Sequence, residues 1–320
     1  MKWGKTSMIA DFSLQGRADI TADALVRDVR HLPSSPRILP HLKRLLSDAN
    51  SAMDEIVSLI RLDVGIAARV LQVANSVFFS KGARCQTVEE AVSRVGYAEI
   101  YDLVSYAVAS QVLVRPLGVY GMEADELWKV SVAGALAAEM LAGRTGQERA
   151  AAYTAGLLHC VGMVAIDEGA LRHARGLTLK HLGFPREATE SERAFFGFTQ
   201  AEAGAALMNQ WEYPSTITEP VRWQYAPRAS GDQARMASLL YAAKWLRSTV
   251  CSSEAVPLPE SIHLQPLGLG SATLRSMVPE LERKLVAVRS LLDQTFSEAD
   301  SPDQTPTNQR FPLRDWNRVR

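Results

Sequence analysis

Cysteine is scarce in this chain, with 3 cysteines among 320 residues. Cys85, Cys160 and Cys251 lie far apart, and no two of them form a C-x-x-C pair. An odd number of widely spaced cysteines argues against a disulfide framework, and the missing C-x-x-C pair argues against a cysteine-based zinc site. This usage fits a reducing compartment, so we predict a cytoplasmic protein.

An excess of either charge is also absent, because 35 Lys and Arg residues balance 35 Asp and Glu residues. A strongly basic nucleic-acid binder needs clustered Lys and Arg to contact phosphates, so the balance argues against that class. Only the C-terminal tail offers such a cluster, with Arg310, Arg314, Arg318 and Arg320. Regulation of RNA or DNA through this tail is a third hypothesis, and nucleic acid is not the expected partner.

Long apolar runs are missing as well, since no stretch approaches the roughly 20 apolar residues of a membrane helix. At the N-terminus, Asp11 interrupts the apolar residues 8–10, which makes a poor signal peptide. The most apolar segment, Val130 to Leu141, carries Ser131 and Glu139 and is typical of a buried helix. We therefore expect no membrane partner. Hydrophobic residues at 47% and charged residues at 22% are ordinary for a globular protein and exclude a disordered chain.

Helical periodicity runs through most of the sequence, and credible strands are few. Asp63 and the Thr87/Glu90 pair are predicted to cap helices, Gly96 to end one, and Asn50-Ser51 to begin another. The chain shows no internal repeat, so the sequence predicts an all-α protein. The later helices are expected at residues 127–141 (closed by Gly143), 148–161, 191–196, 200–211, 234–249 and 273–296, with a loop at 257–270.

The chemically suggestive motifs are mostly incomplete. Gly4-Lys5-Thr6 lacks the strand and first glycine of a phosphate-binding loop, and no H-E-x-x-H or G-x-S-x-G occurs. His159-Cys160 lies in a nearly apolar segment, where a core histidine is the favoured interpretation. A metal ligand or a Cys/His nucleophile pair are the alternatives, although neighbouring helical residues point roughly 100° apart.

Asn75-Ser76 ends the helix that begins at Val64 and precedes Val77-Phe78-Phe79. An asparagine here can tie the backbone of a C-terminal turn, which is the favoured interpretation. The alternative is contact with a partner, for which Asn75, Ser76 and Phe78 are the candidate residues.

Several segments, taken together, resemble the HDOD family, the HD-related output domain of bacterial signalling proteins. The resemblance covers about residues 30–230. Its motifs are Leu32-Pro33-Ser34-Ser35-Pro36, the stretches 62–76 and 87–96, Leu127-Trp128, Gly156-Leu157-Leu158-His159, and Ala201-Glu202-Ala203-Gly204-Ala205 ahead of Trp211 and Pro214.

The resemblance implies a multi-helix bundle in which an HD-like helical subdomain is preceded by a smaller N-terminal helical subdomain. We expect an HDOD domain at 31–230, divided into an N-terminal subdomain (31–122) and an HD-like subdomain (123–230). A loosely attached lead-in (1–30) precedes it. C-terminal helices (231–296) packed on the HD-like part and a disordered tail (297–320) follow.

The family is related to metal phosphohydrolases whose ligands are His and Asp. By the resemblance, the ligand positions are filled here by Val130, Cys160, Gln200 and the Gln224-Tyr225 pair, and only the remnant His159 is kept. Valine cannot ligate a metal, and one histidine cannot hold a catalytic ion alone. We therefore expect no metal, no cofactor and no enzyme activity.

The expected function is a regulatory output module that binds signalling proteins, with a nucleotide as a further ligand to consider. The alternative is a metal-dependent phosphohydrolase of the HD superfamily with a degenerate site.

Overall fold

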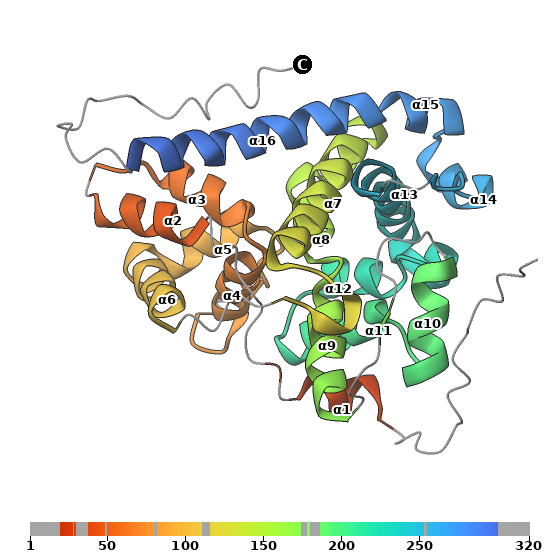
Figure 1. Cartoon of the computed structure of the whole chain (residues 1–320), viewed down its shortest axis with the longest axis horizontal. Coiled ribbons are helices and arrows are strands. Elements are labelled where there is room, and N and C mark those ends of the chain that lie inside the picture. Colours follow the sequence, from red (N-terminus) through yellow and green to blue (C-terminus); the bar gives the residue numbers. More distant parts are fainter. Residues whose placement is uncertain are drawn as a thin grey trace, which may run out of the picture.

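The structure is a computed structural model that describes residues 20–27, 29, 38–48, 50–79, 82–110, 116–173, 178–179, 186–252 and 255–299. Within these ranges it consists of helices joined by turns, and its extended pairing is a single bridge between Leu117 and Met122. The predicted all-α class is therefore confirmed (Figure 1).

Five helices form the N-terminal group, drawn in orange tones in Figure 1. They are α2 (Ile38–Ser47), α3 (Met53–Arg61), α4 (Val64–Asn75), α5 (Val88–Val95) and α6 (Tyr97–Ser110). The caps predicted for α4 and α5 are confirmed: Asp63 accepts a hydrogen bond from the Ile66 N–H at 2.9 Å, and Thr87 accepts one from the Glu90 N–H at 3.1 Å. Gly96 ends α5 with a φ of 88°, a value that favours glycine.

The second group is built around α7 (Ala124–Thr145), which packs along α8 (Arg149–Leu158) and α13 (Ala234–Cys251). Glycines allow the closest approaches: a Cβ on Gly156 would lie 2.6 Å from the Gly134 carbonyl oxygen, so α7 and α8 touch through their backbones. The other helices of this group are α9 (Val161–His173), α10 (Arg186–Phe196), α11 (Gln200–Gln210) and α12 (Ser215–Arg222).

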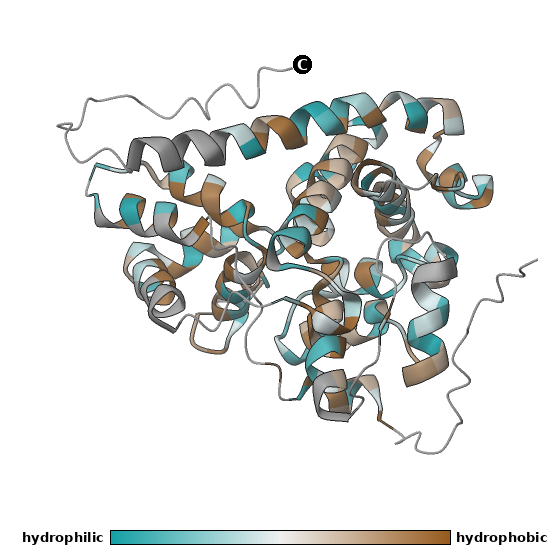
Figure 2. Cartoon of the chain, viewed as in Figure 1, coloured by the Kyte–Doolittle hydropathy of each residue, from teal (hydrophilic) through white to brown (hydrophobic). Residues whose placement is uncertain are grey.

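The C-terminal part comprises α14 (Ser261–Leu264), α15 (Ser271–Ser276) and α16 (Val278–Ala299). In Figure 1, α16 extends across the top of the molecule, and it contacts α7 and α13. Figure 2 shows hydrophilic and hydrophobic turns alternating along it, which is typical of a helix with one covered face. Leu281 and Val288 are accordingly buried, while Val286 is exposed.

Several predicted boundaries are wrong. The helix α7 passes through Gly143 and ends at Gly146, and α3 is preceded by Ala52, which forms no side-chain cap. The expected helix at 148–161 stops at Leu158, and a separate helix, α9, follows the turn at 159–160. The last helix is broken at Met277, and the predicted loop at 257–270 contains α14.

The described part of the lead-in is not loosely attached. Residues Ala22–Val26 form α1, which packs on α9 and α11. Leu25 lies against Gly169 so tightly that a Cβ there would be 2.5 Å from a Leu25 methyl carbon. Residues 1–19, the Leu32–Pro36 motif and the tail from residue 300 lie outside the described residues.

One stretch is long and apolar enough to match a membrane span by length and composition, contrary to the sequence prediction. It is Arg149–Ala170, with a mean hydropathy of 1.4 in its most apolar window. That window is 94% buried inside the protein, and the stretch is interrupted by the turn between α8 and α9. It is therefore a buried segment in the core of the second helical group.

Candidate functional site

His159 lies in the turn between α8 and α9 with 1% of its surface exposed. Its Nδ1–H donates to the Gly156 carbonyl at 2.6 Å, and Gly134 makes room for the ring. The other nitrogen, Nε2, has no hydrogen-bond partner among the described residues. Burial lowers the pKa of His159 well below its usual value, and the charges of Arg247 and Lys244 lower it further. The imidazole is therefore neutral, with a lone pair on Nε2.

Cys160 is buried beside α7, where its Sγ lies 3.0 Å from the Ser131 Oγ. Ser131 uses its own proton on the Leu127 carbonyl at 2.8 Å, so the thiol is the donor in this contact. Burial raises the pKa of the Cys160 thiol. A protonated thiol is neither a nucleophile nor a metal ligand, and the His159 imidazole makes its one hydrogen bond elsewhere. The Cys/His nucleophile alternative thus finds no support in the geometry.

Gln224 connects the turn to α13. Its Nε2 donates to the carbonyls of His159 at 2.9 Å and Val221 at 2.8 Å, while its Oε1 accepts from the Lys244 Nζ at 2.9 Å. The same Nζ lies 3.4 Å from the centre of the Tyr225 ring, a cation–π geometry. The Lys244 amino group therefore contacts both members of the Gln224-Tyr225 pair.

Gln200, on α11, belongs to the same cluster of polar side chains around His159. Its Nε2 donates to the Tyr225 hydroxyl at 3.1 Å, and its backbone N–H donates to Glu192 at 2.7 Å. The Tyr120 hydroxyl donates to the other Glu192 oxygen at 2.9 Å. Burial raises the pKa of Glu192 to about 7, although these hydrogen bonds and the charge of Lys244 act in the opposite direction.

The cluster also contains a second buried cation. Arg247, one turn after Lys244 on α13, is 2% exposed and donates to the Ser248 hydroxyl at 3.1 Å. Burial and the charge of Arg247 lower the pKa of Lys244 well below its usual value. Sequence reasoning missed Lys244, Arg247 and Glu192. The available signal was a Lys and an Arg inside the run Leu239–Arg247, whose other residues are all hydrophobic.

The structure thus brings together His159, Cys160, Gln200, Gln224 and Tyr225, and Val130 is buried one residue before Ser131. These residues do not fit a catalytic metal, because one imidazole nitrogen and a thiol are the only strong donors of the set. Within the described ranges, no three His, Cys, Asp or Glu side chains are grouped so as to hold a metal ion.

The predicted partner residues divide into buried and exposed members. Asn75 is fully buried: its Nδ2 donates to the Cys85 carbonyl at 3.1 Å, and its Oδ1 accepts from the Cys85 N–H at 2.7 Å. Ser76 is half-buried and donates to the Val73 carbonyl at 2.7 Å. Phe78 is 86% exposed. Asn75 therefore positions this turn, and a partner would reach Phe78.

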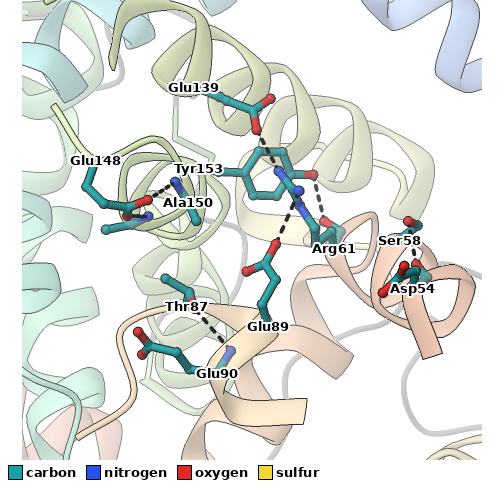
Figure 3. Close-up of polar contacts among 11 residues, drawn as sticks. Asp54, Ser58, Arg61, Thr87, Glu89, Glu90, Glu139, Glu148, Ala150 and Tyr153 are labelled. Carbon is teal, nitrogen blue, oxygen red and sulfur yellow. Dashed lines mark hydrogen bonds and ion pairs between the residues drawn. The ribbon is translucent and has the colours of Figure 1, made fainter. Parts of the chain in front are cut away.

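The two helical groups meet at Arg61, as Figure 3 shows. Its guanidinium lies 2.8 Å from Glu139 of α7 and 3.2 Å from Glu89 of α5, and it stacks 4.0 Å from the centre of the Tyr153 ring of α8. The Tyr153 hydroxyl donates to the Arg61 carbonyl at 2.9 Å. One arginine thus joins α3 and α5 to the helices that carry the candidate site.

The family model of the HDOD domain matches residues 32–227, and the chain therefore belongs to the HDOD family. An uncharacterized protein of Treponema pallidum (strain Nichols) is 26% identical over 219 residues, which is 67% of this chain. The match spans only 42% of the length of that relative.

Two solved structures share the fold. The MmoQ response regulator of Methylococcus capsulatus str. Bath matches with a TM-score of 0.62 at 20% identity, covering 78% of this chain and 98% of that one. A virulence factor of Campylobacter jejuni subsp. jejuni matches with a TM-score of 0.60 at 17% identity, covering 82% and 98%. The fold is therefore the all-α helical bundle of the HDOD family, with a smaller helical group before the larger one.

Proposed function

We propose that this protein is a non-catalytic signal-transduction module that acts in the bacterial cytoplasm by binding another signalling protein. The observation that carries the proposal is the cluster around His159. Its ligand positions hold Val130, a protonated thiol and amides, and these groups cannot activate a water molecule as a metal-bound phosphohydrolase requires.

Two further observations support a binding role. Membership of the HDOD family and the fold shared with a protein named as a response regulator agree with a place in signalling. The turn after α4 presents Val77 and Phe78, which are 88% and 86% exposed. Large apolar side chains that are exposed to water, next to a turn held by the Asn75 hydrogen bonds, are typical of a contact surface.

The chemistry is tested by metal analysis of the purified protein together with a phosphodiesterase assay on a generic substrate. We expect neither stoichiometric metal nor hydrolysis above the level of a His159→Ala variant. Tightly bound metal in the natural chain that is lost in His159→Ala, with hydrolysis that disappears alongside it, would favour the phosphohydrolase alternative instead.

The binding role is tested by capturing partners from bacterial cells with the natural chain and with Phe78→Ser. We expect the substitution to weaken capture of a specific protein while the melting temperature stays unchanged. Arg275→Ser, an exposed change on α15, is the control. Equal capture by all three chains would contradict a partner surface at this turn.

A further inference from the structure

The Lys244 amino group occupies a specific place in the candidate site. It donates to Gln224 at 2.9 Å and lies 3.4 Å from the centre of the Tyr225 ring. These are the two residues that stand, by the family resemblance, at the positions of a histidine pair. The Lys244 amino group thus already contacts the two side chains that stand at the positions of metal ligands.

We propose that the Lys244 amino group is a built-in cation that takes the place of the metal ion in this HD-type site and keeps divalent metals out of it. The inference rests on the proposed non-catalytic function and adds the residue that enforces it. The loss of ligands weakens a metal site, whereas a positive charge on Lys244, beside the lost-ligand positions, opposes a metal even if ligands are regained.

The contacts of Lys244 suit an ammonium group better than they suit a divalent metal. An amide oxygen and the face of an aromatic ring both stabilise a monovalent cation without supplying negative charge. A divalent metal requires anionic or imidazole ligands close to it, and here the groups around Lys244 include a protonated thiol, one neutral imidazole and a carboxyl whose pKa is raised to about 7. Burial and the charge of Arg247 lower the pKa of Lys244, whereas Glu192 raises it. The amide oxygen and the ring face are the contacts that favour the protonated amine.

A second cation strengthens the exclusion. Arg247 is buried on the same face of α13, and its charge lowers the pKa of both His159 and Cys160. Like charges repel strongly in a poorly solvated environment, so a metal beside Lys244 and Arg247 would meet two positive groups. Among the described residues, the buried carboxyl that acts on Lys244 is Glu192, which accepts hydrogen bonds from the Tyr120 hydroxyl and the Gln200 N–H.

The test is a double-mutant cycle that pairs Cys160→Asp with Lys244→Met, each chain being melted in EDTA and in Co²⁺. Cys160→Asp restores the histidine–aspartate pair of the family pattern. With Lys244 retained, we expect no response to Co²⁺. With Lys244→Met added, we expect Co²⁺ to raise the melting temperature by about 4 °C or more and to produce the absorption of ligand-bound cobalt.

Two control chains keep the test decisive. The exposed Lys129→Met, combined with Cys160→Asp, should leave the chain unresponsive to Co²⁺. A chain with Cys160→Asn and Lys244→Met shows whether the fold accepts the loss of the amine. The inference is overturned if this control chain folds while the chain with Cys160→Asp and Lys244→Met shows no response to Co²⁺. It is also overturned if Co²⁺ raises the melting temperature of Cys160→Asp equally with and without Lys244.

A second measurement needs no loss of the lysine. With Lys244 present, a built-in cation should attract a carboxylate, so Cys160→Asp should melt at a higher temperature than Cys160→Asn. The reverse order overturns the inference. Stoichiometric metal or hydrolysis in the natural chain would instead contradict the proposed function, so the two failures are distinguishable.

Discussion

At the scale of single residues, buried polar groups explain more of this protein than exposed ones. Asn75 satisfies both backbone groups of Cys85 from a position with no exposure. The sequence placed it correctly at the end of a helix and named backbone tying as its favoured role. The sequence could not identify the hydrogen-bond partner of Asn75, because Cys85 lies ten residues further on in a turn that has no sequence signature.

The clamp can be tested with Asn75→Ala. The substitution leaves the N–H and the carbonyl of Cys85 without partners inside the protein, so we expect a loss of about 2 to 4 kcal/mol of unfolding free energy. Denaturant unfolding measures it. The matched control is Phe78→Ser, three residues on and exposed, which should change stability little. An equally small effect for both would show that Asn75 is not a clamp.

Glu192 leads to a prediction on pH dependence. Its pKa is raised from 4.5 to about 7 in the folded protein, so this state binds the proton more tightly than the unfolded chain does. Stability should therefore fall as the pH rises from about 4.5 to about 7 and then level off, with a loss of roughly 3 kcal/mol from this group.

Glu192→Gln removes that titration and can keep both hydrogen bonds, since an amide oxygen accepts from Gln200 and an amide N–H can donate to Tyr120. We expect the variant to gain stability relative to the natural chain at pH 8 but not at pH 4.5. Unfolding curves at the two pH values measure the difference. The exposed Glu190→Gln on the same helix should show no such gain, and a gain of equal size at both pH values would contradict the assignment.

At the scale of helices, the sequence predicted the N-terminal ends of helices better than their C-terminal ends. Asp63 and Thr87 act locally, because a cap bonds to a backbone N–H only three residues away. The break between α8 and α9 was missed because Arg149–Ala170 is buried on almost every face, so no polar stripe marks a change of direction. The site itself followed from motif positions, whereas Lys244 entered it through tertiary packing of α13.

The crossing of α9 and α11 depends on Gly162. A Cβ at this position would lie 1.8 Å from the Gln200 carbonyl oxygen and 2.5 Å from the Gly204 nitrogen, both backbone atoms. We expect Gly162→Ala to force the helices apart and cost about 3 kcal/mol or more. Thermal unfolding measures this cost. Gly143→Ala on α7, where the nearest atoms are 3.7 Å away, should be neutral or stabilising.

At the scale of the whole molecule, the two helical groups are joined by polar contacts as well as by a shared apolar core. Trp128 donates to the Leu62 carbonyl at 2.8 Å, and Tyr213 donates to the Ala68 carbonyl at 2.6 Å. Leu62 directly follows α3, and Ala68 lies in the first half of α4, whose C-terminal end leads to Phe78. The proposed partner surface is thus carried by helices that are anchored directly on the site-bearing group.

Arg61 is the residue on which this connection should depend most. Arg61→Met keeps the length of the side chain but leaves Glu139, which is largely buried, without its positive partner, and such a loss costs on the order of 3 kcal/mol. Because the contact joins the groups, we expect hydrogen exchange to accelerate throughout α3, α4 and α5 while the centre of α13 stays protected. Hydrogen exchange read by mass spectrometry measures each helix separately.

The control is Arg84→Met. Arg84 and Glu212 also bridge the two groups, but both are exposed, and an exposed ion pair contributes little. Equal protection patterns for the two variants would mean that the apolar core alone holds the groups together.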